Sequence, residues 1–222
     1  MFVITADQVG SRARDDIVAG TVAALNRDHS ELLALPVDRN AGDELQAMTA
    51  DAHTALDIVL ALTRTGEWSV GLGCGPVRLP LPSATREATG AAFFAAREAV
   101  TRAKKRPTRF AVETGQREAS AEANQTDAAT GSAPWPCADD AEALLNLLLL
   151  MRQRRSPAGW ELYDLVVTGM QQNEAAARLG ISAPAANSRA RAAGLKAELA
   201  SIAALTRLLE KLDLVSGEMD ET

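Results

Sequence analysis

The stretch from Trp160 to Leu199 constrains the fold more tightly than any other part of the chain. Gly180 stands between two short helical patterns, where glycine adopts left-handed backbone angles without steric cost. Ser182 follows it, and its hydroxyl can accept a free backbone N–H at the start of the next helix. Pro184 is tolerated in that first turn, because the N–H that it lacks would have no helical partner there. The pattern predicts a helix, a second short helix, a tight turn and a third helix.

Apolar side chains recur through this stretch at spacings that would bury one face of the last two helices. They are Ala176, Leu179, Ile181, Ala186, Ala190 and Ala193. The outward side of the third helix would then carry Ala185, Asn187, Ser188, Arg189 and Arg191. Asparagine can pair bidentately with adenine and arginine with guanine, and Ser182 and Gln172 can hold phosphates. Helix-turn-helix DNA readers have this order of elements, so we expect double-stranded DNA as the partner.

The charge distribution agrees with this expectation, although the whole chain carries a formal charge of −6. From Met151 to Lys211 there are nine Lys and Arg residues against five Asp and Glu residues. The basic excess therefore coincides with the predicted DNA reader. Because so small an excess binds phosphates weakly, we expect a dimer or a second basic surface, such as Arg102–Arg109, to contribute. The alternative is a helical bundle that acts as an adaptor for a protein partner.

Composition divides the chain into parts. Residues 114–138 are small and polar with few apolar side chains, which predicts a flexible linker. A helical domain is predicted over residues 139–215, beginning with a helix at Asp139–Arg155 that is acidic at its start and basic at its end. It closes with a helix at Leu195–Leu214, whose apolar stripe is typical of a dimer or bundle helix. Residues 216–222 are predicted to form a disordered acidic tail.

Strand and helix patterns alternate over residues 1–113. Strands are expected at Phe2–Thr5, Leu32–Val37, Glu44–Met48, Trp68–Gly73, Val77–Leu81 and Arg109–Val112, and helices at Asp15–Arg27, Asp51–Thr65 and Glu87–Lys105. The order β-α-β-β-α-β is the split ferredoxin-like pattern, which favours an antiparallel sheet with helices on one face. We therefore predict an α+β domain followed by an all-α helix-turn-helix domain.

Composition also bears on the environment of the protein. Hydrophobic residues make up 47% of the chain and aromatic residues only 4%, so the core must be built mainly from Ala, Leu and Val. The longest apolar run, Leu144 to Met151, is interrupted by Asn146 and is shorter than the roughly 20 residues that span a bilayer. Cys74 and Cys137 are far apart, and no secretory leader pattern is present. We expect reduced thiols, a cytoplasmic location and no membrane partner.

Two acidic positions in the first part of the chain are candidates for a metal site. Asp7 directly follows the first predicted strand, and Asp43 lies in a hairpin turn beside Glu44. Carboxylates placed in this way can hold a hard cation such as Mg²⁺. Gly10 and Ser11 would leave room and backbone amides for a phosphate. The structural alternative is that Asp7 caps the following turn and Asp43 stabilises the hairpin.

Four motifs resemble the SatD family of bacterial proteins, whose members have a similar helix-turn-helix at the end. They are Ala6–Arg12 (ADQVGSR), Gly42–Gln46 (GDELQ), Gly71–Gly75 (GLGCG) and Gly90–Ala99 (GAAFFAAREA). The resemblance covers nearly the whole chain. The order of these motifs is also similar to the class III nucleotide cyclase core, in which two aspartates bind two metal ions. Carried over to this sequence, the metal ligands are Asp7 and Asp43, and Gly90 and Arg97 have counterparts too.

The catalytic part of the cyclase pattern is incomplete in this sequence. A cyclase usually has an asparagine just before the arginine of the late helix, whereas Phe93 and Phe94 stand in this neighbourhood. No Lys and Asp pair for reading a purine is evident. We therefore expect a transcriptional regulator whose N-terminal domain is a non-catalytic sensor or dimerisation domain, with Gly10, Ser11 and Arg97 as nucleotide-binding candidates. The alternative is a metal-dependent purine nucleotide cyclase or a related phosphoryl-transfer enzyme.

Overall fold

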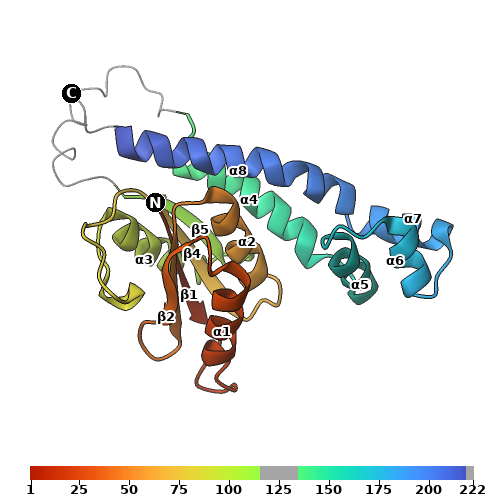
Figure 1. The fold of residues 1–222 in the computed structure, drawn as a ribbon, viewed down its shortest axis with the longest axis horizontal. Coiled ribbons are helices and arrows are strands. Elements are labelled where there is room, and N and C mark those ends of the chain that lie inside the picture. Colours follow the sequence, from red (N-terminus) through yellow and green to blue (C-terminus); the bar gives the residue numbers. More distant parts are fainter. Residues whose placement is uncertain (116–134, 219–222) are drawn as a thin grey trace. The chain divides into compact units, whose positions relative to one another are not determined.

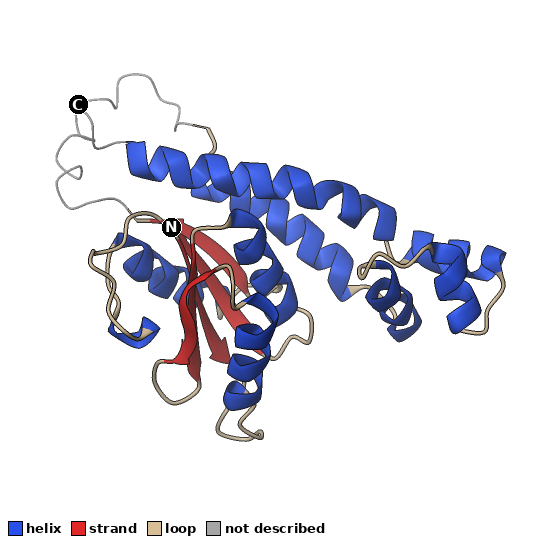
Figure 2. Ribbon diagram, in the orientation of Figure 1, coloured by secondary structure: helices blue, strands red, loops and turns tan. Residues whose placement is uncertain are grey.

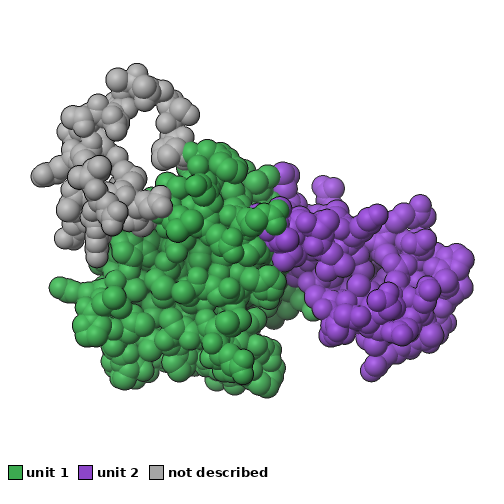
Figure 3. Space-filling model, turned by 45° about the horizontal axis from the view of Figure 1, so that its top comes forward, with its two compact units in different colours: residues 1–146, 205–222 green, residues 147–204 purple. Residues whose placement is uncertain are grey.

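The computed structural model describes residues 1–115 and 135–218 of the chain (Figure 1). Two compact units divide it: residues 1–146 with 205–222, and residues 147–204 (Figure 3). This division falls inside two helices and so differs from the predicted domain bounds. Most of the predicted linker and the end of the predicted tail lie outside the described residues. The described elements are mixed α and β, as predicted, with a five-stranded sheet and eight α-helices.

A five-stranded sheet forms the centre of the first unit (Figure 2). Its strands are β1 (Phe2–Gln8), β2 (Leu33–Arg39), β3 (Glu44–Thr49), β4 (Trp68–Cys74) and β5 (Phe110–Thr114). They lie in the order β2-β3-β1-β4-β5, and every neighbouring pair is antiparallel except β4 and β5. The expectation of a wholly antiparallel sheet was wrong at this edge. A helix connects β4 to β5, and such a crossover brings the next strand back in the same direction.

Helices cover both faces of the sheet, so the expectation of helices on one face was also wrong. The helices α1 (Val18–His29) and α2 (Ala52–Leu62) lie on one side, and α3 (Ala91–Ala103) lies on the other (Figure 1). Glycines in β4 permit the close approach of α3. A Cβ atom at Gly71 would stand 2.2 Å from the backbone nitrogen of Val100, and every residue of β4 is buried.

The segment between β4 and α3 does not form the strand predicted at Val77–Leu81. It is a loop with one short 3₁₀ helix, η1 (Thr85–Glu87). Three prolines, at positions 76, 80 and 82, explain the difference. Proline has no N–H to donate to a neighbouring strand, so a segment with this spacing of prolines cannot complete a hydrogen-bonded ladder.

The remaining helices are α4 (Ala138–Gln153), α5 (Pro157–Val166), α6 (Gln172–Arg178), α7 (Ala183–Ala192) and α8 (Leu195–Glu218). All five were predicted, with bounds that differ by a few residues. The apolar stripe of α8 is used within the chain, because Leu205, Leu209 and Leu212 are buried in the first unit. No helix in the described part of the chain is both long and apolar enough to cross a membrane.

Candidate functional sites

The second unit contains the predicted pair of short helices with a tight turn between them. Gly180 has a φ of +65°, the left-handed conformation that the sequence predicts at this position. The Ser182 hydroxyl caps α7 by accepting a hydrogen bond from the backbone N–H of Ala185 at 3.3 Å. At the start of α6, the Glu174 side chain accepts from the backbone N–H of Gln171 at 3.4 Å, which forms half of a capping box. Gly180 and Ser182 therefore define the turn between the two helices, and Glu174 caps the start of α6.

Small side chains hold α5, α6 and α7 together. The buried cluster contains Leu162 from α5, Ala175 from α6, Ala190 and Ala193 at the end of α7, and Leu195 at the start of α8. Because alanine projects only a methyl group, the helix backbones can approach closely along this core. Burying one face of α7 leaves the other face available to solvent.

The exposed face of α7 carries most of the predicted contact residues. Asn187, Ser188 and Arg191 are exposed on this face, and Ala185 and the capping residue Ser182 are exposed at the start of the helix. Gln172 of α6 is partly buried, and its side-chain amide donates to the Asn187 side-chain oxygen at 3.5 Å. The structure therefore brings Gln172 and Asn187 together, although they lie on different helices.

Arg189 departs from the prediction, because it does not share this face. Its guanidinium lies 3.6 Å from the carboxylate of Glu161 in α5, and its side chain is 26% exposed. At 100° per residue, Arg189 stands about 200° around the helix from Asn187, whereas Arg191 stands only about 40° from it. Asn187 and Arg191 are therefore the pair that projects outward together.

An open groove of about 970 Å³ lies beside this face. Its polar lining comes from Gln172, Asn187, Arg191 and Lys196, and its other lining residues are apolar or glycine. Lys196 was missed in the sequence, because it stands at the start of α8, after the predicted reading helix. The turn at Gly194, where φ is +67°, brings Lys196 beside Arg191. The spacing of the two residues in the sequence does not indicate this turn.

A buried cluster of charged side chains is the second feature that sequence reasoning missed. Glu198 of α8 is 1% exposed and forms ion pairs with Arg152 of α4 and with Arg155. Arg155 also donates to the backbone oxygen of Ala193 at 2.9 Å. Its guanidinium lies 4.3 Å from the centre of the Trp160 ring. This cluster joins the end of α4, the start of α8 and the end of α7 within the second unit.

The ion pairs change the charge that the second unit can offer to a partner. Arg152 and Arg155 contributed to the basic excess in the sequence, but both side chains are buried against Glu198. Arg191 and Lys196 are exposed and stand beside the groove. Arg191 and Lys196 therefore supply accessible positive charge beside the exposed face of α7, while Arg154 and Arg178 are exposed elsewhere in the second unit.

The basic stretch Arg102–Arg109 is largely engaged within the first unit. Arg102 lies 2.9 Å from the Glu113 carboxylate, and Arg106 lies 3.0 Å from that of Glu142. The Lys104 ammonium lies 2.8 Å from the Asp7 carboxylate. These pairs weaken the case for this stretch as the second phosphate-binding surface.

Asp7 does not follow β1 as predicted, but lies inside it. It stands opposite Glu44 of β3 and Ser69 of β4, so the ladder continues past Thr5. Its carboxylate is paired with Lys104 and its side chain is 22% exposed. A cation at this position would have to compete with an ammonium group that already neutralises the carboxylate.

Asp43 lies in the turn before β3, as predicted. Its carboxylate accepts a hydrogen bond from the Ser11 hydroxyl, and its backbone oxygen accepts from the N–H of Gln8 at 3.0 Å. The Ser11 hydrogen bond is the main cause that lowers the pKa of Asp43, and the charges of Lys104 and Arg12 add to it. The carboxylate is thus held in its ionised form.

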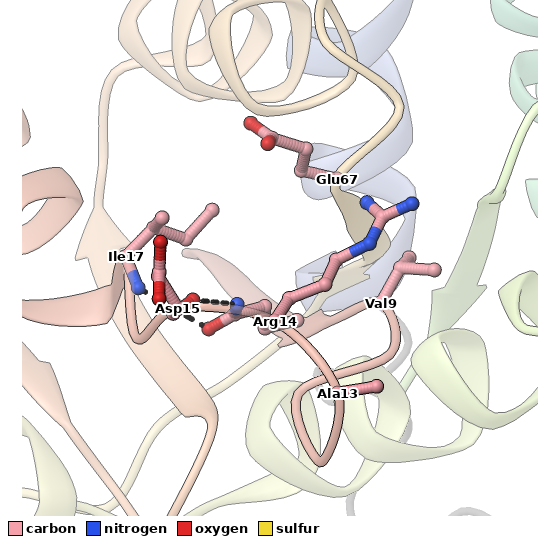
Figure 4. A pocket seen from close by; sticks show the side chains of 7 residues that line it. Val9, Ala13, Arg14, Asp15, Ile17 and Glu67 are labelled. Atoms are coloured by element: carbon pink, nitrogen blue, oxygen red, sulfur yellow. Dashed lines mark hydrogen bonds between the residues drawn. The ribbon is translucent and has the colours of Figure 1, made fainter.

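Two open hollows of about 380 Å³ each share Gln8 in their lining. The first hollow is lined by Ser11, Asp43 and neighbouring residues. The second is shown in Figure 4, where the Arg14 side chain extends toward Glu67. The buried Gln8 shapes the loop between them, because its amide donates to the backbone oxygen of Asp15 at 2.6 Å.

The other two residues predicted to bind a nucleotide are Gly10 and Arg97, and they lie on different elements. Gly10 has a φ of +70° and accepts a backbone hydrogen bond from Ala13 at 2.9 Å, which forms the turn after β1. Arg97 is exposed on α3, where its guanidinium lies 5.1 Å from the centre of the Phe94 ring. It precedes Lys104 by about 10 Å along the helix axis. Over residues 1–115 and 135–218, no group of three or more His, Cys, Asp and Glu side chains is placed to hold a metal ion.

Comparison with known protein families, with curated proteins and with solved structures finds no match to this chain.

Proposed function

We propose that this chain is a DNA-binding protein, and specifically a transcriptional regulator, in which α6 and α7 form a helix-turn-helix and α7 enters the major groove. One observation carries the proposal. A left-handed turn at Gly180 joins two short helices over an alanine core, and the outer face of the second helix exposes Asn187 and Arg191. The motifs quoted above further support membership of the SatD family.

The chemistry of the exposed face suits the edges of base pairs. Asn187 and Arg191 are one helical turn apart, about 6 Å along the axis, which is close to the spacing of two base-pair steps. Asparagine suits adenine and arginine suits guanine. Gln172 holds the Asn187 side-chain oxygen, and Lys196 and Ser182 are suited to phosphates on either side.

Site selection followed by anisotropy measurements tests this assignment. Asn187→Ala and Arg191→Ala should each weaken binding to the selected duplex by about 1–3 kcal/mol and relax the choice of one base. Arg27→Ala is the matched control, because Arg27 is exposed on α1 and pairs with its neighbour Asp28 at 2.8 Å. If both α7 variants bind like the control, these residues do not read bases.

For the first unit, we propose a ferredoxin-like, nucleotide-cyclase-like domain that acts as a sensor or dimerisation module. The order β1-α1-β2-β3-α2-β4 and the strand order β2-β3-β1-β4 support this topology. The ionised Asp43, with Ser11 and Arg12 beside it, supports recognition of Mg²⁺ with a nucleotide phosphate. The pairing of Asp7 with Lys104 favours a sensor over an enzyme, because two-metal catalysis would need both aspartates.

Calorimetry with ATP or GTP and Mg²⁺ tests the sensor role. Binding that depends on Mg²⁺ and is lost in Asp43→Asn would agree with it, whereas pyrophosphate release would establish the cyclase alternative instead. If calorimetry detects no heat of binding at millimolar nucleotide, the proposed sensor role of the first unit is wrong.

A further inference from the structure

One face of α4 presents large apolar side chains that the described part of the chain does not cover. Leu144, Leu147 and Leu150 are 48%, 65% and 41% exposed. At 100° per residue they fall within a sector of about 120° on the helix. The opposite side of α4 is buried and includes Leu145 and Leu149, at 1% and 2% exposure. Contiguous exposed leucines on an otherwise packed helix are typical of an interaction surface.

Charged side chains stand at the two ends of this leucine face. Asp140 lies seven residues before Leu147, and Arg154 lies seven residues after it. Because seven residues make nearly two helical turns, Asp140 projects on the same side as Leu147, and Arg154 stands where the helix ends, two turns beyond Leu147. Asp140 stands in the first turn, where it also accepts a hydrogen bond from the backbone N–H of Cys137 at 3.0 Å. Arg154 follows the last residue of α4 and is exposed.

We propose that the leucine face of α4 is the interface of a homodimer, in which α4 packs antiparallel against α4 of a second copy around a two-fold axis at Leu147. In this register Leu147 meets Leu147 of the second copy, and Leu144 meets its Leu150. Asp140 of each copy meets Arg154 of the other, so one surface is complementary to itself, as a two-fold interface requires.

The charges select this arrangement over the alternatives. A parallel pair would place Asp140 beside Asp140 and Arg154 beside Arg154, with repulsion at both ends. Antiparallel packing also brings the positive end of each helix dipole beside the negative end of the other. The apolar stripe of α8, the more obvious dimer helix in the sequence, is not available, because Leu205 and Leu209 are buried within the chain.

A charge-swap experiment on the full chain tests the proposal without DNA. Sedimentation velocity over a concentration series should show a reversible dimer of the wild-type chain. Arg154→Glu should weaken it by about 100-fold, because each interface then places Asp140 against a glutamate. Asp140→Lys should do the same by setting a lysine against Arg154. An equimolar mixture of the two variants should restore a one-to-one heterodimer, since both charge pairs are then complementary again.

Two further variants separate the interface from the fold. Leu147→Lys places a charge at the centre of the face and should leave only monomer, with an unchanged circular dichroism spectrum because the side chain is exposed. Leu79→Lys is the control, since Leu79 is 75% exposed in the loop before α3, and its dimer affinity should match the wild type. A wild-type chain that is monomeric at every concentration overturns the proposal, as does a dimer that survives Leu147→Lys or a variant mixture that stays monomeric.

Discussion

Replacing Glu198 with glutamine should destabilise the second unit more than any change on its surface. Glu198 is 1% exposed, and its two partners, Arg152 and Arg155, have side chains that are 5% and 0% exposed. Glutamine keeps the size of the side chain but removes the negative charge. Two buried guanidinium groups would then lose the negative charge of Glu198.

The cost follows from the burial of the cluster. Removing one partner of a buried ion pair costs about 3–5 kcal/mol, because the charge left behind loses water without gaining a partner. A folded protein is stable by only about 5–15 kcal/mol, so this is a large fraction of the total. For a chain of this length the melting temperature should fall by about 6–20 °C. Arg155 would also keep its hydrogen bond to Ala193, so the fold need not be lost entirely.

Urea unfolding followed by circular dichroism measures the free-energy change, and hydrogen exchange of peptides from α5 to α7 locates it. Glu161→Gln is the matched control. It removes the same charge from a residue that is 61% exposed and 3.6 Å from Arg189, and such surface pairs contribute about 0–1 kcal/mol. The reasoning about the buried cluster is refuted if Glu198→Gln lies within 1 kcal/mol of this control.

Two further predictions concern the first unit. Gly71→Ala should lower the free energy of urea unfolding by about 1–3 kcal/mol or more, because its Cβ would meet the backbone nitrogen of Val100 at 2.2 Å. Gly20→Ala in α1 is the control, and it should raise this free energy by up to about 1 kcal/mol, because nothing lies within 4 Å of the added Cβ. Equal effects would contradict the close packing of α3. Asp51→Ala should cost about 1 kcal/mol at neutral pH, because Asp51 caps α2 through the N–H of Thr54. Hydrogen bonds from Thr54 lower the pKa of Asp51, so its contribution is present above the unfolded pKa of about 3.9 and is lost as the pH falls through the folded pKa. The difference between variant and wild type should therefore shrink in acid, and a difference that grows there would contradict the role of the charged cap.

Features set by neighbouring residues were predictable from the sequence. The turn at Gly180 and the cap at Ser182 depend on side chains within a few positions, and both are present where the pattern indicates. The ion pair between Arg152 and Glu198 was not predictable, because 46 residues separate the partners in the sequence. In the sequence, Arg152 looks like one of the basic residues that ordinarily stand at the end of a helix.

In the first unit, too, contacts between residues that are distant in the sequence were harder to predict than local structure. β1 was predicted to end at Thr5, yet Asp7 remains in the ladder with its carboxylate paired to Lys104. The placement of α3 on the second face of the sheet had one signal in the sequence. Gly71 and Gly73 alternate along β4, and glycine within a strand often marks the close approach of another backbone.

Binding of the full chain to duplex DNA across a salt series tests the central proposal most directly. The proposed helix-turn-helix predicts measurable affinity at low salt and a linear fall of log K with log salt concentration, because phosphate contacts release counterions. Replacing Lys196 with alanine should reduce the slope by about one unit if it contacts a phosphate. No binding at low salt would contradict DNA recognition and would make α7 a surface for a protein partner.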